Sequence, residues 1–267
     1  MRTPRALPLL RAAHPVPGLA VTVLTALLAT GMGVGARATV TLVVAVLSGQ
    51  LVVGWTNDLI DLERDRRVGR RDKPLATGRL SVALVRSATA AAGVVCVAAS
   101  LLCGLGAGLL HLLAIGAALA YNAGLKPTWL SWLPYSLAFG SLPAVVSLSR
   151  DPAALPPWWM VAVGALLGFA AHLLNAMPDL ADDAATGIRG LPHRLAPTTV
   201  PRLAALALVA ATVIAVVGGR APPTAGQWVL LTVVLVLAVA ATRTTGKTPF
   251  YAAIAIAGVN IVILLIG

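Results

Sequence analysis

Long apolar runs dominate this sequence and constrain its fold more than any other feature. Nine of them, bounded by proline, glycine or charge, are each long enough to cross a bilayer as a helix. Charged residues make up only 11% of the chain, whereas a soluble domain needs roughly a quarter to cover its surface. The pattern predicts an all-α integral membrane protein with spans at 16–35, 38–58, 82–104, 108–125, 132–149, 157–178, 198–218, 226–242 and 249–266.

The basic residues predict how these spans are oriented. If the N-terminus is cytoplasmic, all of the 20 lysines and arginines except Arg37, Arg150 and Arg220 lie on the cytoplasmic side. This is the positive-inside pattern of membrane proteins, and it places the C-terminus outside. Because the basic residues sit in short loops between apolar runs, the net charge of +11 indicates membrane topology and no nucleic-acid partner. We expect the protein in a bacterial plasma membrane.

Eight of the nine acidic residues fall in two clusters, both at predicted cytoplasmic helix ends. Each cluster lies in the same pattern, N-x3-D-x3-D-x3-G-x-R-x2-P, which runs from Asn57 to Pro74 and again from Asn175 to Pro192. The patterns follow the second and the sixth predicted spans, so the repeat unit is four helices. We therefore expect one membrane domain built from two four-helix halves, about 16–125 and 132–242, and a ninth helix around a central cavity. Sites at the interface of such repeats are common in membrane bundles.

The spacing within each pattern predicts what the acidic residues do. Steps of three and four keep side chains on one helix face, so Asn57, Asp58, Asp61 and Asp65 form one stripe. Asn175, Asp179 and Asp183 form the second, and the part played by Asp182 beside Asp183 stays open. Carboxylate and amide oxygens favour Mg²⁺.

Basic residues follow both acidic stripes directly. Acidic residues that hold a metal and basic residues that hold phosphate together make up a diphosphate site. The basic residues that we predict to contact the diphosphate are Arg67, Arg71, Lys73, Arg189 and Arg194. The alternative is a pair of salt-bridged loops without a ligand.

These motifs resemble those of the UbiA-type intramembrane prenyltransferases, and the resemblance spans the whole chain. The family's first motif, N-D-x-x-D-x-x-x-D followed by basic residues and Pro-x-x-x-Gly, is matched at Asn57, Asp58, Asp61, Asp65, Pro74 and Gly78. Its second motif, D-x-x-x-D-x-x-x-G, is matched at Asp179, Asp183 and Gly187. The segment from Arg11 to Pro15 is similar to the start of the family's first helix.

The resemblance implies an activity and a set of site residues. Two Mg²⁺ ions would grip a prenyl diphosphate, loss of diphosphate would make an allylic cation, and an acceptor would capture it within an apolar chamber. The residues implied as metal ligands are Asn57, Asp58, Asp61, Asp65, Asp179 and Asp183, and Asp61, Asp65, Asp179 and Asp183 are our catalytic candidates. The family often has Tyr-x-x-x-Lys after its fourth helix, whereas Tyr121 and Lys126 are five apart here. Lys126 remains a predicted diphosphate contact.

Four further residues are candidates for the acceptor or the chamber. Gln50 lies seven residues before Asn57, on the same face, where it either contacts the acceptor or makes an interhelical hydrogen bond. His172 precedes Asn175 by three and would line the chamber or act as a base. Arg11 and His14 either recognise a carboxylated or phenolic acceptor or anchor the chain at the interface.

Two functions within the resemblance compete. The leading hypothesis is prenyl transfer to a lipophilic, aromatic acceptor, and the alternative is a terpene synthase that uses the same cation without an acceptor. The sequence has only 12 aromatic residues to cradle a migrating cation, which favours transfer. A transporter would place its ionisable residues near the middle of the membrane, and a phosphatidyl-alcohol transferase would carry a D-G-x-x-A-R motif that this sequence lacks.

Overall fold

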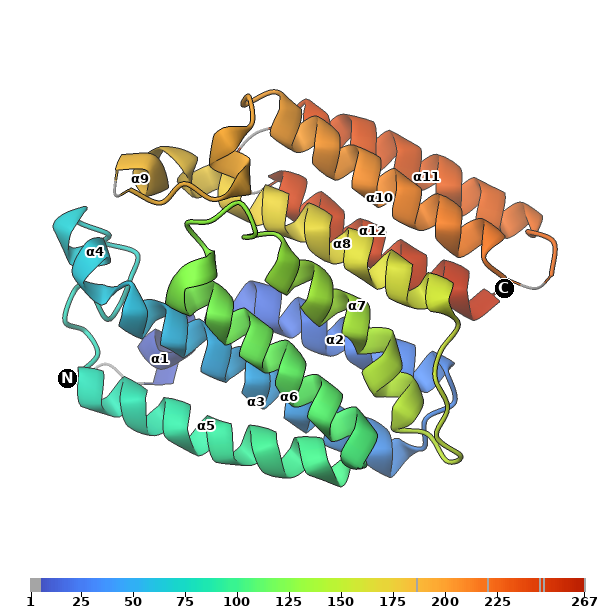
Figure 1. Ribbon diagram of the computed structural model, residues 1–267, viewed down its shortest axis with the longest axis horizontal. Coiled ribbons are helices and arrows are strands. Elements are labelled where there is room, and N and C mark those ends of the chain that lie inside the picture. The colour runs from blue at the N-terminus through green and yellow to red at the C-terminus, as the bar shows by residue number, and fades with distance from the viewer. Residues whose placement is uncertain (1–5, 186, 220, 245, 247, 267) are drawn as a thin grey trace.

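The fold is all-helical. The computed structural model describes residues 6–185, 187–219, 221–244, 246 and 248–266, and no strand occurs among them. Of the predicted charges, Arg2, Arg5, Arg220 and Lys247 lie outside these residues, and Asp182 lies outside the described side chains. Nine helices longer than a few turns lie side by side within the described part (Figure 1). They are α2 (Pro15–Gly31), α3 (Ala36–Ile60), α5 (Val82–Leu102), α6 (Leu105–Ala120), α7 (Leu133–Leu148), α8 (Trp158–Ala176), α10 (Thr199–Val217), α11 (Ala225–Thr242) and α12 (Thr248–Ile266).

Short helical segments gather at one end of this bundle. Figure 1 shows α1, α4 and α9 there, at the end opposite the C-terminus. The short segments are α1 (Ala6–Ala12), α4 (Leu62–Arg67), η1 (Tyr121–Leu125), η2 (Met177–Asp179), α9 (Leu180–Ala185) and η3 (Leu191–Arg194). Both acidic motifs lie in or beside them, so the even repeat offset does bring the two motifs to the same end.

Six helices of the described chain are long and apolar enough to cross a membrane. A seventh span is possible if α1 and α2, which meet at a bend of 76°, are counted as one. Two further helices, Leu133–Leu148 and Thr248–Leu264, are apolar but shorter than any of these six. The nine predicted runs are therefore all helical, whereas the count of nine membrane spans stays a prediction.

The helices pack around a central space. α3 packs against α5 and α6, and α8 packs against α7 and α10. The two groups are joined by α6, which packs against α7, and by α2, which contacts α3, α7 and α12. α12 in turn contacts α8. The central space is lined by α2, α3, α6 with η1, α7, α8 and α12, and also by α4, η2 and α9. Among the described residues, α5, α10 and α11 contribute none to this lining.

Small residues let α7 and α8 approach closely. A Cβ atom built on Gly164 would lie 2.4 Å from the carbonyl oxygen of Phe139, and one on Gly168 would lie 2.4 Å from that of Tyr135. Such spacing of small residues, four apart on one helix face, is a common way for membrane helices to pack. It fixes α8, which ends in the second motif, against α7.

Adding a methyl group at this contact should therefore destabilise the fold. In Gly168→Ala the new Cβ meets backbone, so the helices must move apart, at a cost of about 1–3 kcal/mol. The matched control is Gly116→Ala in α6, where nothing lies within 4 Å of the added Cβ. We expect a lower thermal unfolding midpoint in detergent for Gly168→Ala alone. Equal midpoints for the two variants would contradict this packing.

Candidate functional site

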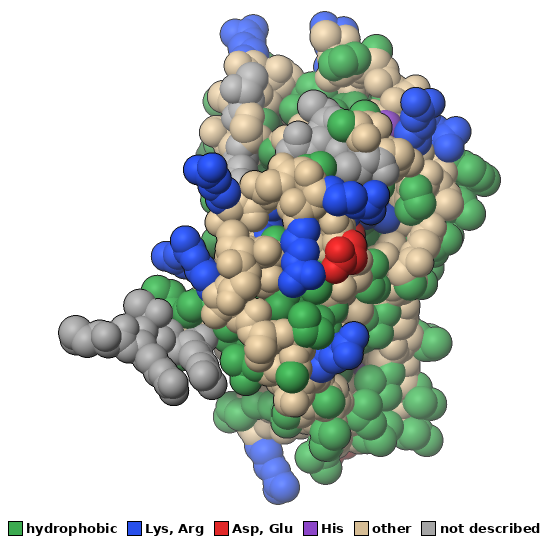
Figure 2. All heavy atoms as spheres, turned by 90° about the vertical axis from the view of Figure 1, so that its left-hand side faces the viewer, with side chains coloured by type: hydrophobic (Ala, Val, Ile, Leu, Met, Phe, Trp, Pro, Cys, Tyr) green, Lys and Arg blue, Asp and Glu red, His purple; other side chains and the backbone are tan. Residues whose placement is uncertain are grey.

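A cavity of about 290 Å³ lies between the helices and carries both acidic motifs in its lining. Its polar lining residues are His14, Gln50, Asn57, Asp61, Arg64, Arg70, Lys73, Tyr121, Asn122, Lys126, Tyr135, Asn175, Asp179 and Asp183. The rest of the lining is mainly apolar, with residues such as Val21, Leu24, Phe139, Leu167 and Ile254. The end of the molecule that carries α4 and α9 shows acidic side chains surrounded by lysine and arginine (Figure 2). One cavity thus combines a charged part with an apolar chamber.

The first motif contributes Asn57 and Asp61 to the cavity. Asp61 lies where α3 ends and α4 begins, and its Oδ2 accepts hydrogen bonds from Arg64 at 2.7 Å and from Asn57 Nδ2 at 3.2 Å. Arg64 follows Asp61 by three residues, so the two side chains share one face of α4. Arg64 is absent from the set of residues predicted from the sequence, although this spacing could have identified it.

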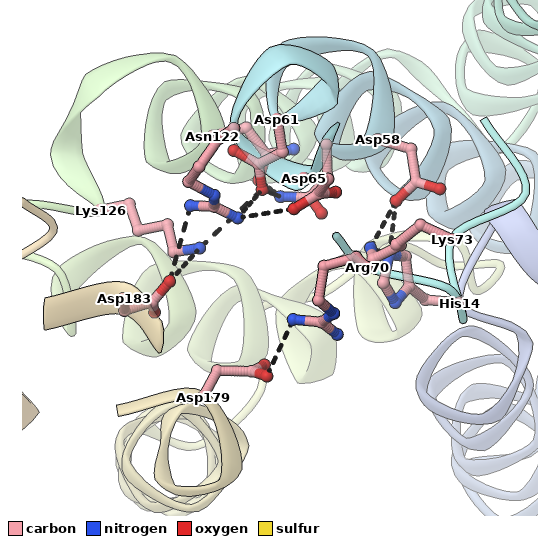
Figure 3. Close-up of polar contacts among 12 residues, drawn as sticks. His14, Asp58, Asp61, Asp65, Arg70, Lys73, Asn122, Lys126, Asp179 and Asp183 are labelled. Carbon is pink, nitrogen blue, oxygen red and sulfur yellow. Dashed lines mark hydrogen bonds and ion pairs between the residues drawn. The ribbon is translucent and has the colours of Figure 1, made fainter. Parts of the chain in front are cut away.

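The second motif meets the first through basic side chains. Arg70 donates to Asp179 Oδ1 at 3.2 Å, and Arg64 Nη1 lies 3.5 Å from Asp183 Oδ1. Lys126 Nζ lies 3.5 Å from Asp183 Oδ1 and 3.9 Å from Asp61 Oδ2. Figure 3 shows Arg70 and Lys126 between the carboxylates of the two motifs. The structure therefore brings the two motifs together across one cavity.

Two residues of the predicted first stripe do not line the cavity. Asp58 is 1% exposed, and its Oδ1 bonds to His14 Nε2 at 3.1 Å and to Lys73 Nζ. Asp65 is 2% exposed and lies 3.5 Å from Arg64. Of the three aspartates in the predicted stripe, Asp61 alone lines the cavity, although Asp61 and Asp65 both contact Arg64 Nη2.

The predicted diphosphate contacts divide into two groups. Lys73 and Lys126 line the cavity, whereas four exposed arginines do not: Arg67, Arg71, Arg189 and Arg194. The chain turns at Gly69, whose φ of 69° lies in the left-handed region that favours glycine. After this turn Arg70 lines the cavity and its neighbour Arg71 is exposed. The sequence indicated a basic segment here but not which arginine points inward.

A π-helical turn explains the unusual spacing of Tyr121 and Lys126. Residues Tyr121–Leu125 form this turn, and Lys126 N donates to Tyr121 O, five residues back, at 3.0 Å. One extra residue per turn lets both side chains line the cavity although they are five apart. Asn122 also lines the cavity and donates to the Val53 carbonyl of α3 at 3.0 Å. Such π-bulges frequently occur at functional sites.

The four acceptor or chamber candidates also separate. His14 and Gln50 line the cavity, whereas Arg11 is exposed outside its lining. His172 is 2% exposed and does not line the cavity; it hydrogen-bonds Ser131 at 3.1 Å. Its ring stands against Tyr121 and Tyr135, which do line the cavity, so His172 supports the wall from behind.

Burial and pairing set the charges around the polar end of the cavity. The hydrogen bond to Arg70 lowers the pKa of Asp72 to about 2, and the same contact raises the pKa of Arg70. Burial raises the pKa of the Asp65 carboxyl, against the lowering effect of Lys73 and Arg64. Burial also lowers the pKa of His193, whose Nε2 lies 3.9 Å from Asp183 Oδ2. Arg70 and Asp72 thus carry full charges at neutral pH.

The oxygen donors of this site fit Mg²⁺. Asp61, Asp179 and Asp183 offer carboxylates, and Asn57 and Asn175 offer amide oxygens, in the same lining. No group of three histidine, cysteine or acidic side chains within the described residues is close enough to hold a metal by itself. Mg²⁺ does not require one, because it is usually held by one or two carboxylates together with water and substrate phosphate.

Comparison with known proteins agrees with this arrangement. The sequence model of the UbiA prenyltransferase family matches residues 18–249. No curated protein matches the sequence. Among solved structures, an apo UbiA homologue from Aeropyrum pernix K1 is similar with a TM-score of 0.70 and 20% identity, covering 92% of this chain and 94% of that one.

Two further structures are similar over nearly their full length. A UbiA homologue from Archaeoglobus fulgidus bound to GPP and Mg²⁺ has a TM-score of 0.70 and 16% identity, covering 96% of this chain and 99% of that one. A structure of digeranylgeranylglyceryl phosphate synthase has a TM-score of 0.67 and 13% identity, with 98% of each chain covered. At these identities the structures establish the fold, while the family model establishes descent. This chain is therefore an integral membrane protein that belongs to the UbiA prenyltransferase family.

Proposed function

We propose that this protein transfers the prenyl group of a prenyl diphosphate to a lipophilic aromatic acceptor within the membrane, in a reaction that depends on Mg²⁺. The observation that carries the proposal is the meeting of two acidic motifs, with basic side chains between them, in the lining of a largely apolar cavity. A charged end suits a diphosphate, and an apolar chamber suits an isoprenoid tail.

The carboxylates of both motifs would hold the metal. Asp61, Asp179 and Asp183 are the principal candidates, with the amide oxygens of Asn57 and Asn175 beside them. Asp65, the remaining catalytic candidate, would act through Arg64, which lies 3.5 Å away. When bound, Mg²⁺ would neutralise charge that develops on the departing diphosphate.

The cations between the motifs would bind the phosphate oxygens. Arg64, Arg70 and Lys126 are now paired with Asp61, Asp179 and Asp183. Charge-assisted hydrogen bonds to phosphate are strong, and arginine makes them in a fixed fork geometry. These side chains could therefore exchange a carboxylate partner for a phosphate oxygen. Lys73, predicted from the sequence to contact the diphosphate, lines the same cavity.

Aromatic rings line the chamber into which an allylic cation would form. Tyr121, Tyr135, Phe139 and Phe250 all line the cavity, and the rings of Tyr121 and Tyr135 meet edge to face at 5.3 Å. Ring faces attract cations, and an apolar chamber keeps water from quenching them. The same rings support the alternative function, a terpene synthase that rearranges the cation without an acceptor.

The family fold also supports a proposal about how the chain crosses the membrane. We propose a single membrane domain in which 16–125 and 132–242 are related halves and all nine apolar helices cross the bilayer. In this arrangement the N-terminus and both motifs face the cytoplasm of a bacterial cell, and the C-terminus lies outside. The basic surface around the acidic residues in Figure 2 agrees with the positive-inside rule.

Product analysis of purified protein tests the proposed function. Protein in detergent would be incubated with geranyl, farnesyl or geranylgeranyl diphosphate, with and without a panel of phenolic acceptors. We expect prenylated acceptor only when Mg²⁺ is present, no turnover in EDTA, and recovery when Mg²⁺ is returned in excess. Hydrocarbons or prenyl alcohols formed without an acceptor would favour the terpene synthase, and full activity in EDTA would contradict the metal dependence.

A further inference from the structure

One arginine lies at the centre of the carboxylates that the sequence predicts to hold metal. Arg64 Nη2 lies 2.7 Å from Asp61 Oδ2 and 3.5 Å from Asp65 Oδ1. Arg64 Nη1 lies 3.5 Å from Asp183 Oδ1 in the second motif. In Figure 3 the carboxylates of Asp61 and Asp65 lie close together, and that of Asp183 lies opposite them. One guanidinium thus joins three carboxylates of the two motifs.

The other cations of the cavity reach fewer of the motif aspartates. Lys126 lies within 4 Å of two of them, and Arg70 lies within 4 Å of one. Arg64 contacts three, and only 18% of its side chain is exposed. It follows Asp61 by three residues, so formation of α4 alone brings these two side chains together. Among these three cations, Arg64 is the one that the aspartates surround.

The repeated pattern does not require a cation at this position. Arg64 lies between the two aspartates of the first pattern, three residues after Asp61 and one before Asp65. The residue at the same position of the second pattern is Asp182. The asparagine and aspartates that both patterns share account for oxygen ligands to a metal. A positive charge among them is particular to the first motif.

Arg64 and a Mg²⁺ ion compete for the same oxygens. Mg²⁺ binds its oxygen ligands at about 2.1 Å. An ion on both Asp61 Oδ2 and Asp183 Oδ1 would lie between these two oxygens, where the guanidinium lies now. Two cations at such short range repel each other strongly where water is scarce. The cation that joins these carboxylates is therefore supplied by the chain itself.

Other oxygens of the two motifs remain for one Mg²⁺ ion. Within the described part of the chain, every side-chain contact of the Asp61 carboxylate uses Oδ2, which leaves its Oδ1 unengaged. Asp179 is 45% exposed and contacts Arg70 through Oδ1, which leaves its Oδ2. One or two carboxylates, completed by water and substrate phosphate, are the usual ligands of Mg²⁺ in proteins. The arrangement suits a single ion better than two.

We propose that Arg64 takes the place of one of the two metal ions that the resemblance implies, so that this site works with a single Mg²⁺, an inference that rests on the proposed binding of a prenyl diphosphate. Arg64 then keeps its carboxylate partners when substrate binds, and contact with phosphate falls to Arg70 and Lys126. It acts as a positioning residue, because it holds the aspartates of both motifs together before metal and substrate arrive.

Counting bound metal ions tests this proposal directly. Mn²⁺ would replace Mg²⁺, because both ions suit octahedral oxygen ligands and free Mn²⁺ can be measured by electron paramagnetic resonance. Wild-type protein in detergent would be titrated with Mn²⁺ at saturating geranyl S-thiolodiphosphate, an unreactive analogue of the substrate, with the analogue alone as the blank. We expect one Mn²⁺ per protein. Two would overturn the inference and leave the proposed diphosphate site standing, whereas no Mn²⁺ bound with the analogue would overturn both.

Removing the arginine should open its place to a metal ion. In Arg64→Met three carboxylates lose the cation that they share, so we expect a second bound Mn²⁺ and a lower unfolding midpoint in EDTA. Mg²⁺ without substrate should raise that midpoint by several degrees, since an ion that binds only the folded state stabilises it. The wild type should respond much less. Arg66→Met is the matched control on the same helix, because Arg66 pairs with Glu63 at the surface, and it should keep one Mn²⁺.

A conservative variant separates the charge of Arg64 from its packing. Arg64→Lys retains the positive charge, so it should bind one Mn²⁺ and show little stabilisation by Mg²⁺ alone. A second Mn²⁺ in Arg64→Lys as well as in Arg64→Met would mean that the charge does not replace an ion, and it would overturn the inference. So would a single Mn²⁺ in Arg64→Met. If Arg64→Met does not fold even in Mg²⁺, the wild-type count still decides between one ion and two.

Discussion

Replacing Asp61 with alanine is expected to lower turnover by at least about 10³-fold, as for loss of a group that stabilises transition-state charge. Asp61 is where the first motif meets both Arg64 and Lys126, at 2.7 Å and 3.9 Å. Its loss removes a carboxylate that would hold the metal and leaves these cations with the remaining aspartates. The measurement is the initial rate of prenyl transfer at saturating Mg²⁺, beside a thermal unfolding curve that confirms folding.

A neighbouring acidic residue provides the control for this substitution. Glu63 lies on the same short helix, is exposed, and pairs with Arg66 at 3.0 Å on the surface. Glu63→Ala removes the same charge from the same segment without altering the cavity lining, so it should retain wild-type activity. Comparable activity in Asp61→Ala and Glu63→Ala would remove Asp61 from the site.

Replacing Lys126 with methionine should lower turnover by about 10²-fold, as expected when one preorganised donor to developing charge is removed. Methionine nearly preserves the length and the apolar stem of lysine but not its charge. The Lys126 ammonium lies within 4 Å of both Asp61 and Asp183, so it joins the two motifs, as Arg64 also does. We expect the KM for prenyl diphosphate to rise and the rate at saturation to fall.

An exposed basic residue provides the matched control for Lys126. Arg66 pairs with Glu63 at the surface and does not line the cavity, so Arg66→Met should behave as wild type. If both variants lost activity equally, the general positive charge of this end of the molecule would matter and the position of Lys126 would not. Unchanged kinetics in Lys126→Met would contradict its assignment to phosphate.

The sequence alone was sufficient for the family and for the pairing of the motifs. Two copies of one pattern, after the second and sixth apolar runs, required both to lie at the same end of a helical bundle, as they do. The resemblance to UbiA-type prenyltransferases is confirmed by the family model. These two predictions could be made from the sequence because they depend on the order of the helices along the chain and not on the direction of any one side chain.

Side-chain direction was harder to predict because the motifs lie where helices break. Periodicity placed Asp58, Asp61 and Asp65 on one stripe, but only Asp61 lines the cavity. Asp58 is buried against His14 and Lys73, and Asp65 is buried beside Arg64. The left-handed turn at Gly69 similarly puts Arg70 inside and Arg71 outside. Where the backbone is not regularly helical, a spacing of three or four residues no longer places side chains on the same face.

Local helix geometry hid two further features. Tyr121 and Lys126 are five residues apart, one more than in the family pattern, and a regular α-helix would not place them on one face. The π turn brings both side chains to the cavity lining. Asp58 matches the family motif in sequence, yet its contacts are with His14 and Lys73. His14 lies 44 residues earlier in the chain, so this contact depends on the packing of the α1–α2 corner against α3.

The most direct test of the account is whether the two motifs form one metal-dependent diphosphate site. Equilibrium binding of geranyl S-thiolodiphosphate would be measured with and without Mg²⁺ for the wild type, Asp61→Ala, Asp179→Ala and the double variant. We predict Mg²⁺-dependent binding in the wild type, its loss in either single variant, and no further loss in the double variant, since residues of one site are not additive. Binding that ignores Mg²⁺, or wild-type affinity in either single variant, would contradict a shared site.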